Sequence, residues 1–141
     1  MTSVSISRLT VVELQCLLGR RRRNREIDAD MERKATAAFE EDVAQGFLEV
    51  HPLEDQHAIR ARDLLSRLGT IPLRTLDALH LAIASGINAT VVATADDTFA
   101  TAAANLRLSV EWFGEAKRIG RRRLISFNKV RQPTRPRRTD E

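Results

Sequence analysis

The sequence predicts an α/β fold in which a parallel sheet is covered by helices on both faces. Segments with strand-like apolar patterns alternate along the chain with segments of helical periodicity, an order typical of strands joined by crossover helices. The run "ATVVAT" (89–94) has no polar alternation, as expected for a strand that is buried on both sides. The length of 141 residues corresponds to a single domain with a modest core.

The first part of the chain contains one predicted strand and two predicted helices. "SVSIS" (3–7) alternates apolar and polar residues and predicts a short strand. Thr10 is expected to cap a helix that ends near Arg23 in the basic run "RRRRNR", which complements the dipole of a last turn. Asp28 is expected to cap a second helix, which ends at Gly46. The residues of this second helix expected to face the core are Met31, Ala35, Ala38, Phe39 and Val43.

The remainder of the domain alternates three predicted strands with three predicted helices. Pro52 stops the first of these strands, and Gly69 ends the first of these helices. Ala58, Ala61 and Leu65 are expected to face inward from that helix. The strands are expected at 47–53, 89–94 and 108–113, and the helices at about 55–68, 75–86 and 97–107.

Charge divides the chain into an expected folded domain at 1–113 and a basic tail at 114–141. The first region has 13 basic and 16 acidic residues, whereas the second has 10 basic and 3 acidic residues. The tail contains prolines and has no periodicity, so we expect most of it to be disordered, although "LISFNKV" (124–130) is compatible with a strand. Its cations should attract polyanions non-specifically, with an affinity that falls as salt rises.

Cysteine content and the first residues of the chain make the cytoplasm the default location. The single cysteine, Cys16, excludes an internal disulfide, and Arg8 and Glu13 come too early for a signal peptide. Residues 78–95 lack formal charge over about the length of a membrane span, but "SGIN" divides them into a helix and a strand. We therefore expect no membrane segment.

An acidic residue in the apolar helix "TLDALHLAIASG" requires compensation. Asp77 lies in the first turn of this helix, and burying an unpaired carboxylate costs several kcal/mol. Glu13 and Asp96 are expected at comparable places, in the first turn of the first helix and at the end of the 89–94 strand. Taken alone, each acid is better explained by the helix dipole or an N-cap. Together they can converge at the carboxyl ends of the strands and share a hard divalent cation.

Three neighbouring residues are secondary candidates. Asp97 is expected to cap the following helix and can also reach an ion, and Thr94 offers a hydroxyl to a metal-bound water or as a cap. His80, one turn after the buried acid, is either a packed residue with one hydrogen bond, a partner of the acids or a nucleic-acid contact. His51 and His57 show no metal-ligand spacing with it, which argues against zinc.

Three segments resemble the PIN domain of VapC-type toxins. They are "SRLTVVEL" with Glu13, "LDALHLAIASG" with Asp77 and "VVATADDTFATAAANLRLSV" with Asp96, and together they span residues 4 to about 113. The resemblance implies a small three-layer α/β/α ribonuclease that hydrolyses RNA phosphodiesters with Mg²⁺ or Mn²⁺. It also implies that Glu13, Asp77 and Asp96 are the catalytic, metal-binding acids.

The same resemblance implies partners. These are a cognate VapB-like antitoxin, an RNA substrate and a second copy of the chain in a homodimer. Arginines at the rim of the site are candidates for contacts with RNA phosphates. They are Arg8, Arg74, Arg20 and Arg21.

The family's usual first strand, which ends in an aspartate within "LDTS"-like residues, has no counterpart before the strand at 3–7. We therefore expect an amino-terminally truncated PIN-like parallel sheet that lacks the usual first central strand. We also expect impaired ribonuclease activity, because the first acidic ligand is absent. The alternative is a non-catalytic PIN-like module that binds nucleic acid or antitoxin through the same scaffold and the basic tail.

Overall fold

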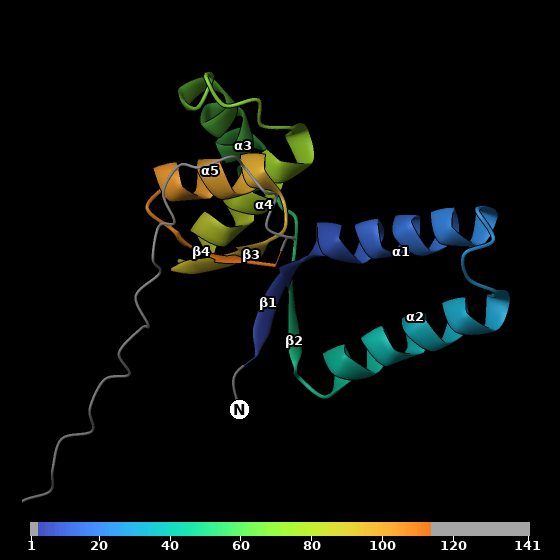
Figure 1. Cartoon of the computed structure of the whole chain (residues 1–141). Coiled ribbons are helices and arrows are strands. Elements are labelled where there is room, and N and C mark those ends of the chain that lie inside the picture. The colour runs from blue at the N-terminus through green and yellow to red at the C-terminus, as the bar shows by residue number, and fades with distance from the viewer. Residues whose placement is uncertain (1–2, 114–141) are drawn as a thin grey trace, which may run out of the picture.

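A computed structural model describes residues 3–113 of the chain, which form five helices and four strands (Figure 1). The predicted strand at 124–130 and the expected disorder of 114–141 lie outside these residues. In chain order the elements are β1 (Val4–Ser7), α1 (Arg8–Arg23), α2 (Ala29–Ala44), β2 (Leu48–His51), α3 (Asp55–Arg67), α4 (Thr75–Gly86), β3 (Val91–Thr94), α5 (Asp97–Asn105) and β4 (Ser109–Trp112).

The strands form two parallel pairs. Val4–Ser7 lies opposite Leu48–His51, and Val91–Thr94 lies opposite Ser109–Trp112, in each case without a shift along the strand. Helices connect the members of each pair, α1 and α2 in the first and α5 in the second. The prediction of an α/β fold with parallel strands is confirmed, but the expectation that the 89–94 strand is buried on both sides is wrong, because Val91 and Ala93 are exposed. Within residues 3–113 the two pairs remain separate, because no strand is hydrogen-bonded to both.

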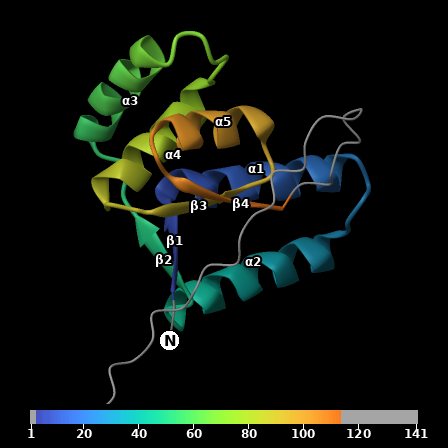
Figure 2. The same ribbon diagram turned by 60° about the vertical axis from the view of Figure 1, so that its left-hand side comes forward.

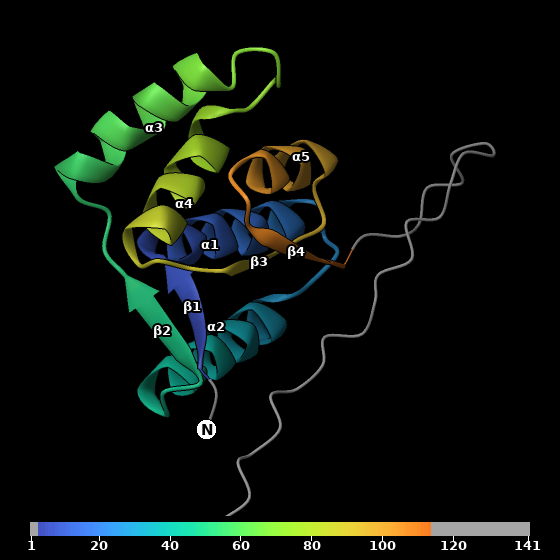
Figure 3. The same ribbon diagram turned by 90° about the vertical axis from the view of Figure 1, so that its left-hand side faces the viewer.

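The core lies where α3, α4 and α5 pack together above the β3–β4 pair. Figures 2 and 3 show α3 beside α4, and α5 over the two strands. Alanines supply most of the buried positions, and their small side chains let these helices approach closely, while Leu81 is fully enclosed between them. The buried cluster consists of Ala61, Leu64, Ala78, Leu81, Ala82, Ala102 and Ala103.

Helices α1 and α2 extend away from this core as an antiparallel pair (Figure 1). An ion pair of 3.1 Å between Arg22 and Glu32 joins them, and Leu18 is the buried residue of α1. No residue of α2 is buried, and Met31 is 53% exposed, so the expectation that its apolar stripe faces the core is wrong. The stripe is real in the sequence, but α2 packs mainly against α1 and β2, which leave Met31 and Ala38 exposed and the other three residues of the stripe half-buried.

Side-chain caps fix where the helices begin. Asp28 caps α2 as predicted, accepting a hydrogen bond of 2.8 Å from the backbone N–H of Met31. Ser7, not Thr10, caps α1, because the strand continues directly into the helix and the Ser7 hydroxyl accepts from the Thr10 N–H. Glu13 therefore lies in the second turn of α1 rather than the first. No helix within residues 3–113 is long and apolar enough to cross a membrane.

Candidate functional site

The first turns of α4 gather the acids that the sequence singled out. Asp77 and His80 lie three residues apart on this helix, a spacing that places two side chains on the same face. The rest of α4 is apolar and supplies the centre of the core, so the helix position is fixed by packing. Only 16% of the Asp77 side chain is exposed, so its carboxylate requires a partner that compensates its charge.

Arg74 provides that compensation. Its Nε lies 3.4 Å from Asp77 Oδ2, and one of its terminal nitrogens lies 3.6 Å from Asp96 Oδ2. One guanidinium is therefore shared by two carboxylates from different helices. The Arg74 side chain is 77% exposed, so each contact is worth no more than about 1 kcal/mol, and the position remains open to solvent.

Asp96 has a second role as the cap of α5. Its Oδ1 accepts a hydrogen bond of 2.7 Å from the N–H of Phe99, and its own N–H donates to Thr94 Oγ1 at 3.1 Å. The prediction that Asp97 caps this helix is wrong, because Asp97 is already its first residue. The capping interpretation describes Asp96, whereas the Thr94 hydroxyl binds the N–H of the cap residue instead of capping the helix. Asp96 Oδ2 is left as the oxygen directed to Arg74.

Glu13 reaches α4 through His80. Glu13 Oε2 lies 2.7 Å from His80 Nε2, and His80 Nδ1 lies 2.8 Å from the hydroxyl of Ser7. A carboxylate only accepts, so Nε2 carries a proton, and in the neutral imidazole Nδ1 then accepts from the Ser7 hydroxyl. His80 thus has two hydrogen bonds and is a partner of an acid, one of the three predicted alternatives. The sequence did not predict the role of Ser7 as a helix cap and a partner of His80, although a serine between a strand and a helix is a favoured N-cap.

The predicted acids therefore meet α4 in two separate contacts. Asp77 and Asp96 share Arg74, whereas Glu13 is bound to His80. Carboxylates are suitable ligands for a hard divalent cation. Among residues 3–113, however, no group of three or more His, Cys, Asp or Glu side chains is placed to hold a metal ion. As they are arranged, these residues do not fit a complete divalent-metal site, and their metal-binding role stays a prediction.

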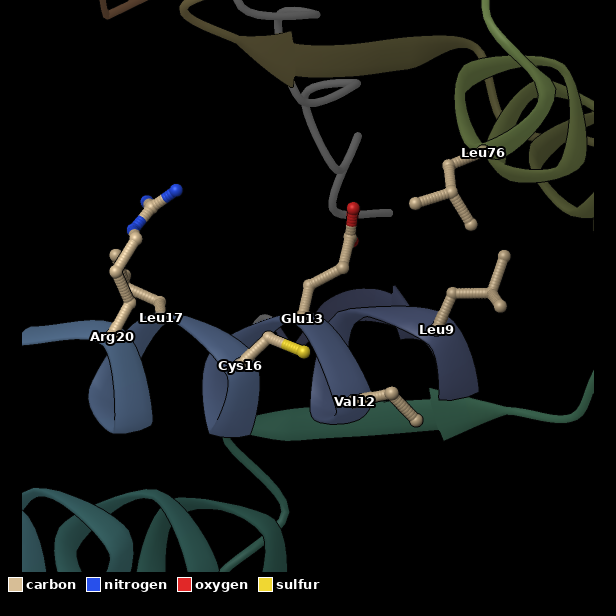
Figure 4. A pocket seen from close by; sticks show the side chains of 7 residues that line it. All are labelled: Leu9, Val12, Glu13, Cys16, Leu17, Arg20 and Leu76. Atoms are coloured by element: carbon tan, nitrogen blue, oxygen red, sulfur yellow. The ribbon is translucent and has the colours of Figure 1, made fainter. Parts of the chain in front are cut away.

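The remaining arginine candidates lie on α1. Arg8 is the first residue of the helix, and Arg21 lies 3.9 Å from Glu26. Arg20 lines an apolar cavity of about 270 Å³ together with Glu13, and Figure 4 shows both side chains rising from the same side of α1. The other residues around this cavity are Leu9, Val12, Cys16, Leu17 and Leu76. Arg20 therefore shares the lining of one cavity with Glu13, one of the predicted acids.

Comparison with known proteins gives one match. The family model described as "PIN domain" matches residues 2–105, which include β1 through α5 and all three predicted acids. A comparison with curated proteins and one with solved structures found no match. The match covers well over half of the 141 residues. The chain therefore belongs to the PIN domain family.

Proposed function

We propose that this PIN domain is a VapC-like toxin of a toxin–antitoxin system, an RNA phosphodiesterase that works with Mg²⁺ or Mn²⁺ and has impaired activity. The nuclease-like fold and the three acids brought to the first turns of α4 support the proposal. Arg74 supports the impairment, because its guanidinium already binds Asp77 and Asp96. The PIN domain match that includes all three acids is the observation that carries this proposal.

In this proposal the chain's own residues attract and position RNA. The backbone phosphates of RNA are drawn by exposed cations around the acids, with Arg8, Arg20 and Arg74 as the candidates. Arg74 can pair with a phosphate instead of with the carboxylates, because it is exposed and its present contacts are weak. His80 and Ser7 hold Glu13 towards α4. Asp77, Asp96 and Glu13 are the residues whose substitution should affect cleavage.

The proposal includes protein partners and a location. A VapB-like antitoxin holds the toxin silent, two copies of the chain form a homodimer, and both proteins are cytoplasmic. Exposed apolar side chains support the existence of partners, since Val12, Met31 and Leu76 are each 45% exposed or more. Val12 and Leu76 line the cavity beside Glu13, so a protein that covers them also covers one of the acids.

A second candidate function is a non-catalytic module that binds nucleic acid or an antitoxin. The observation in its favour is that, in the part of the chain that the structure describes, the acids are already paired with Arg74 and His80 and form no three-ligand metal group. The two candidates differ in whether cleavage of RNA depends on Asp77. The ribonuclease and the nucleic-acid-binding form of the module both bind RNA, whereas the antitoxin-binding form need not.

Cleavage of a fluorescent RNA by the full chain in Mg²⁺ and in Mn²⁺ distinguishes them. The matched variants are Asp77→Asn and Asp63→Asn, since both remove one negative charge and Asp63 is an exposed residue of α3. Slow cleavage that is lost in Asp77→Asn and kept in Asp63→Asn supports the ribonuclease. RNA binding without cleavage supports the module. Absence of both binding and cleavage overturns the ribonuclease and the nucleic-acid-binding form of the module, and leaves only the antitoxin-binding form.

A further inference from the structure

A second cavity lies at the opposite end of α4 from the acids. It has a volume of about 510 Å³ and lies between the end of β2, the start of α3 and the end of α4. Figure 3 shows how β2 leads into α3, which then runs beside α4. By helical rise the end of α4 is about 14 Å from Asp77. The polar side chains around the cavity are His51, Glu54, Gln56, His57, Arg60, Ser85 and Asn88.

His57 is the residue that makes this cavity unusual. It is only 8% exposed, and its Nδ1 accepts a hydrogen bond of 3.0 Å from the backbone N–H of Glu54. A ring nitrogen that accepts carries no proton, so the proton of the neutral imidazole is on Nε2. The backbone at the start of α3 therefore fixes this histidine as a donor through Nε2.

The Nε2–H of His57 has no hydrogen-bond partner among residues 3–113. No fully enclosed polar side-chain atom in that part of the chain lacks a partner, so Nε2 must be reachable from the cavity. Gly86 keeps it reachable, since a Cβ at that position would lie 3.1 Å from Nε2. A buried side chain thus presents an unused donor to an open polar cavity.

The charged side chains around the cavity are the guanidinium of Arg60 and the carboxylate of Glu54. Arg60, on the same helix as His57, forms no ion pair with any residue of the described range. The carboxylate of Glu54 also lines the cavity, but Gln56 Nε2 donates to its Oε2 at 2.6 Å. The dipole at the start of α3 is already complemented by its cap Glu54 and by Asp55 in the first turn, so it adds no further attraction. A guanidinium and a fixed N–H donor form a combination that binds phosphate oxygens.

We propose that this cavity binds a phosphate monoester, with Arg60 and the Nε2–H of His57 as its main contacts. The volume exceeds that of a single phosphate and leaves room for an attached ribose and base. Ser85 and Asn88 offer a hydroxyl and an amide at the other side of the cavity. The ligand is either a free mononucleotide or the terminal phosphate of an RNA. This site is separate from the acids of α4, so it stands independently of the proposed ribonuclease function.

Binding to the full chain tests the proposal, with inorganic phosphate, a 5′-mononucleotide and an oligoribonucleotide with and without a 5′-phosphate as probes. His57→Asn keeps an acceptor near Nδ1 but removes the donor, and His57→Gln places an amide N–H near Nε2. Gly86→Ala leaves His57 in place and crowds its Nε2. Gly19→Ala is the matched control, because its Cβ would meet only the flexible end of Arg23, at 3.4 Å. None of these changes alters the charge of the basic 114–141 region, whose non-specific attraction stays constant.

We expect His57→Asn and Gly86→Ala to weaken phosphate binding by about tenfold or more, as for the loss of a donor to a charged group. Gly19→Ala should bind as the unmodified chain does, and His57→Gln should bind more tightly than His57→Asn. Equal affinities for the mononucleotide and for inorganic phosphate identify a free ligand. A higher affinity for the oligonucleotide with a 5′-phosphate than for the one without it identifies the end of an RNA. Equal affinity of the unmodified chain, His57→Asn and Gly86→Ala for every probe would overturn the proposal.

Discussion

Substitution of Ser7 by alanine removes two interactions through one oxygen atom. The hydroxyl caps α1 by accepting from Thr10 N–H at 3.3 Å, and it bonds His80 Nδ1 at 2.8 Å. Loss of an N-cap typically costs about 1 kcal/mol. Ser7 is only 6% exposed, so loss of its bond to His80 adds about 1 kcal/mol. The expected decrease in the free energy of unfolding is about 2 kcal/mol, which lowers the melting temperature by roughly 8 °C for a domain of this size.

Urea unfolding followed by circular dichroism measures this change. Ser5→Ala is the matched control on the same strand, because its bond of 3.1 Å to His51 is exposed, and the expected loss is below about 0.5 kcal/mol. A double-mutant cycle of Ser7→Ala with His80→Leu isolates the second interaction and should give a coupling of about 1 kcal/mol. Additive effects in that cycle would refute the contact between Ser7 and His80. A loss of less than about 0.5 kcal/mol in Ser7→Ala alone would refute the cap as well.

Substitutions at four further positions test the local structure by thermal or urea unfolding. Asp96→Ala should destabilise the chain by about 1 kcal/mol, because the bond of 2.7 Å from Phe99 N–H is lost, whereas Asp96→Asn should keep most of this stability. Asp28→Ala should cost a similar amount, about 1 kcal/mol, and equal stability of this variant and the unmodified chain would contradict the capping of α2. Gly46→Ala should cost about 1 kcal/mol through backbone strain alone, since the residue has φ of +78° and a Cβ would meet nothing within 4 Å. Met31→Ser should change stability by less than about 0.5 kcal/mol, because this side chain is mostly exposed.

Local signals in the sequence were sufficient to predict most elements of the fold. Asp28 caps α2 where an aspartate precedes a helical pattern, and the uninterrupted apolar run before Thr94 is a parallel strand. The apolar stripe of α2 was also recognised, but a stripe indicates only that one face is apolar and not that another element covers it. Met31 therefore remained exposed, against expectation.

Contacts between residues far apart in the chain could not be predicted from the sequence. Ser7 and His80 are 73 positions apart, and Glu13 and His80 are 67 apart, so neither pairing has a local signature. The same applies to the contact between Arg74 and Asp96, which depends on where α5 begins relative to α4. The contact between Arg74 and Asp77 is different, because these residues are only three positions apart, a local spacing that the sequence itself displays. The sequence predicts that Asp77 needs compensation, and this local arginine supplies it.

The affinity of Mn²⁺ for the Arg74→Met variant, measured by calorimetry on the full chain, tests the central claim that Arg74 neutralises Asp77 and Asp96. Methionine keeps the apolar stem and removes the cation, and Arg67→Met makes the same change at an exposed position of α3. Removal of a positive charge at 3.4 and 3.6 Å from the two carboxylates should tighten Mn²⁺ binding by about tenfold, while Arg67→Met should leave it unchanged. Asp77→Asn in the Arg74→Met background should reverse the gain. Equal Mn²⁺ affinity of Arg74→Met and the unmodified chain would contradict the claim.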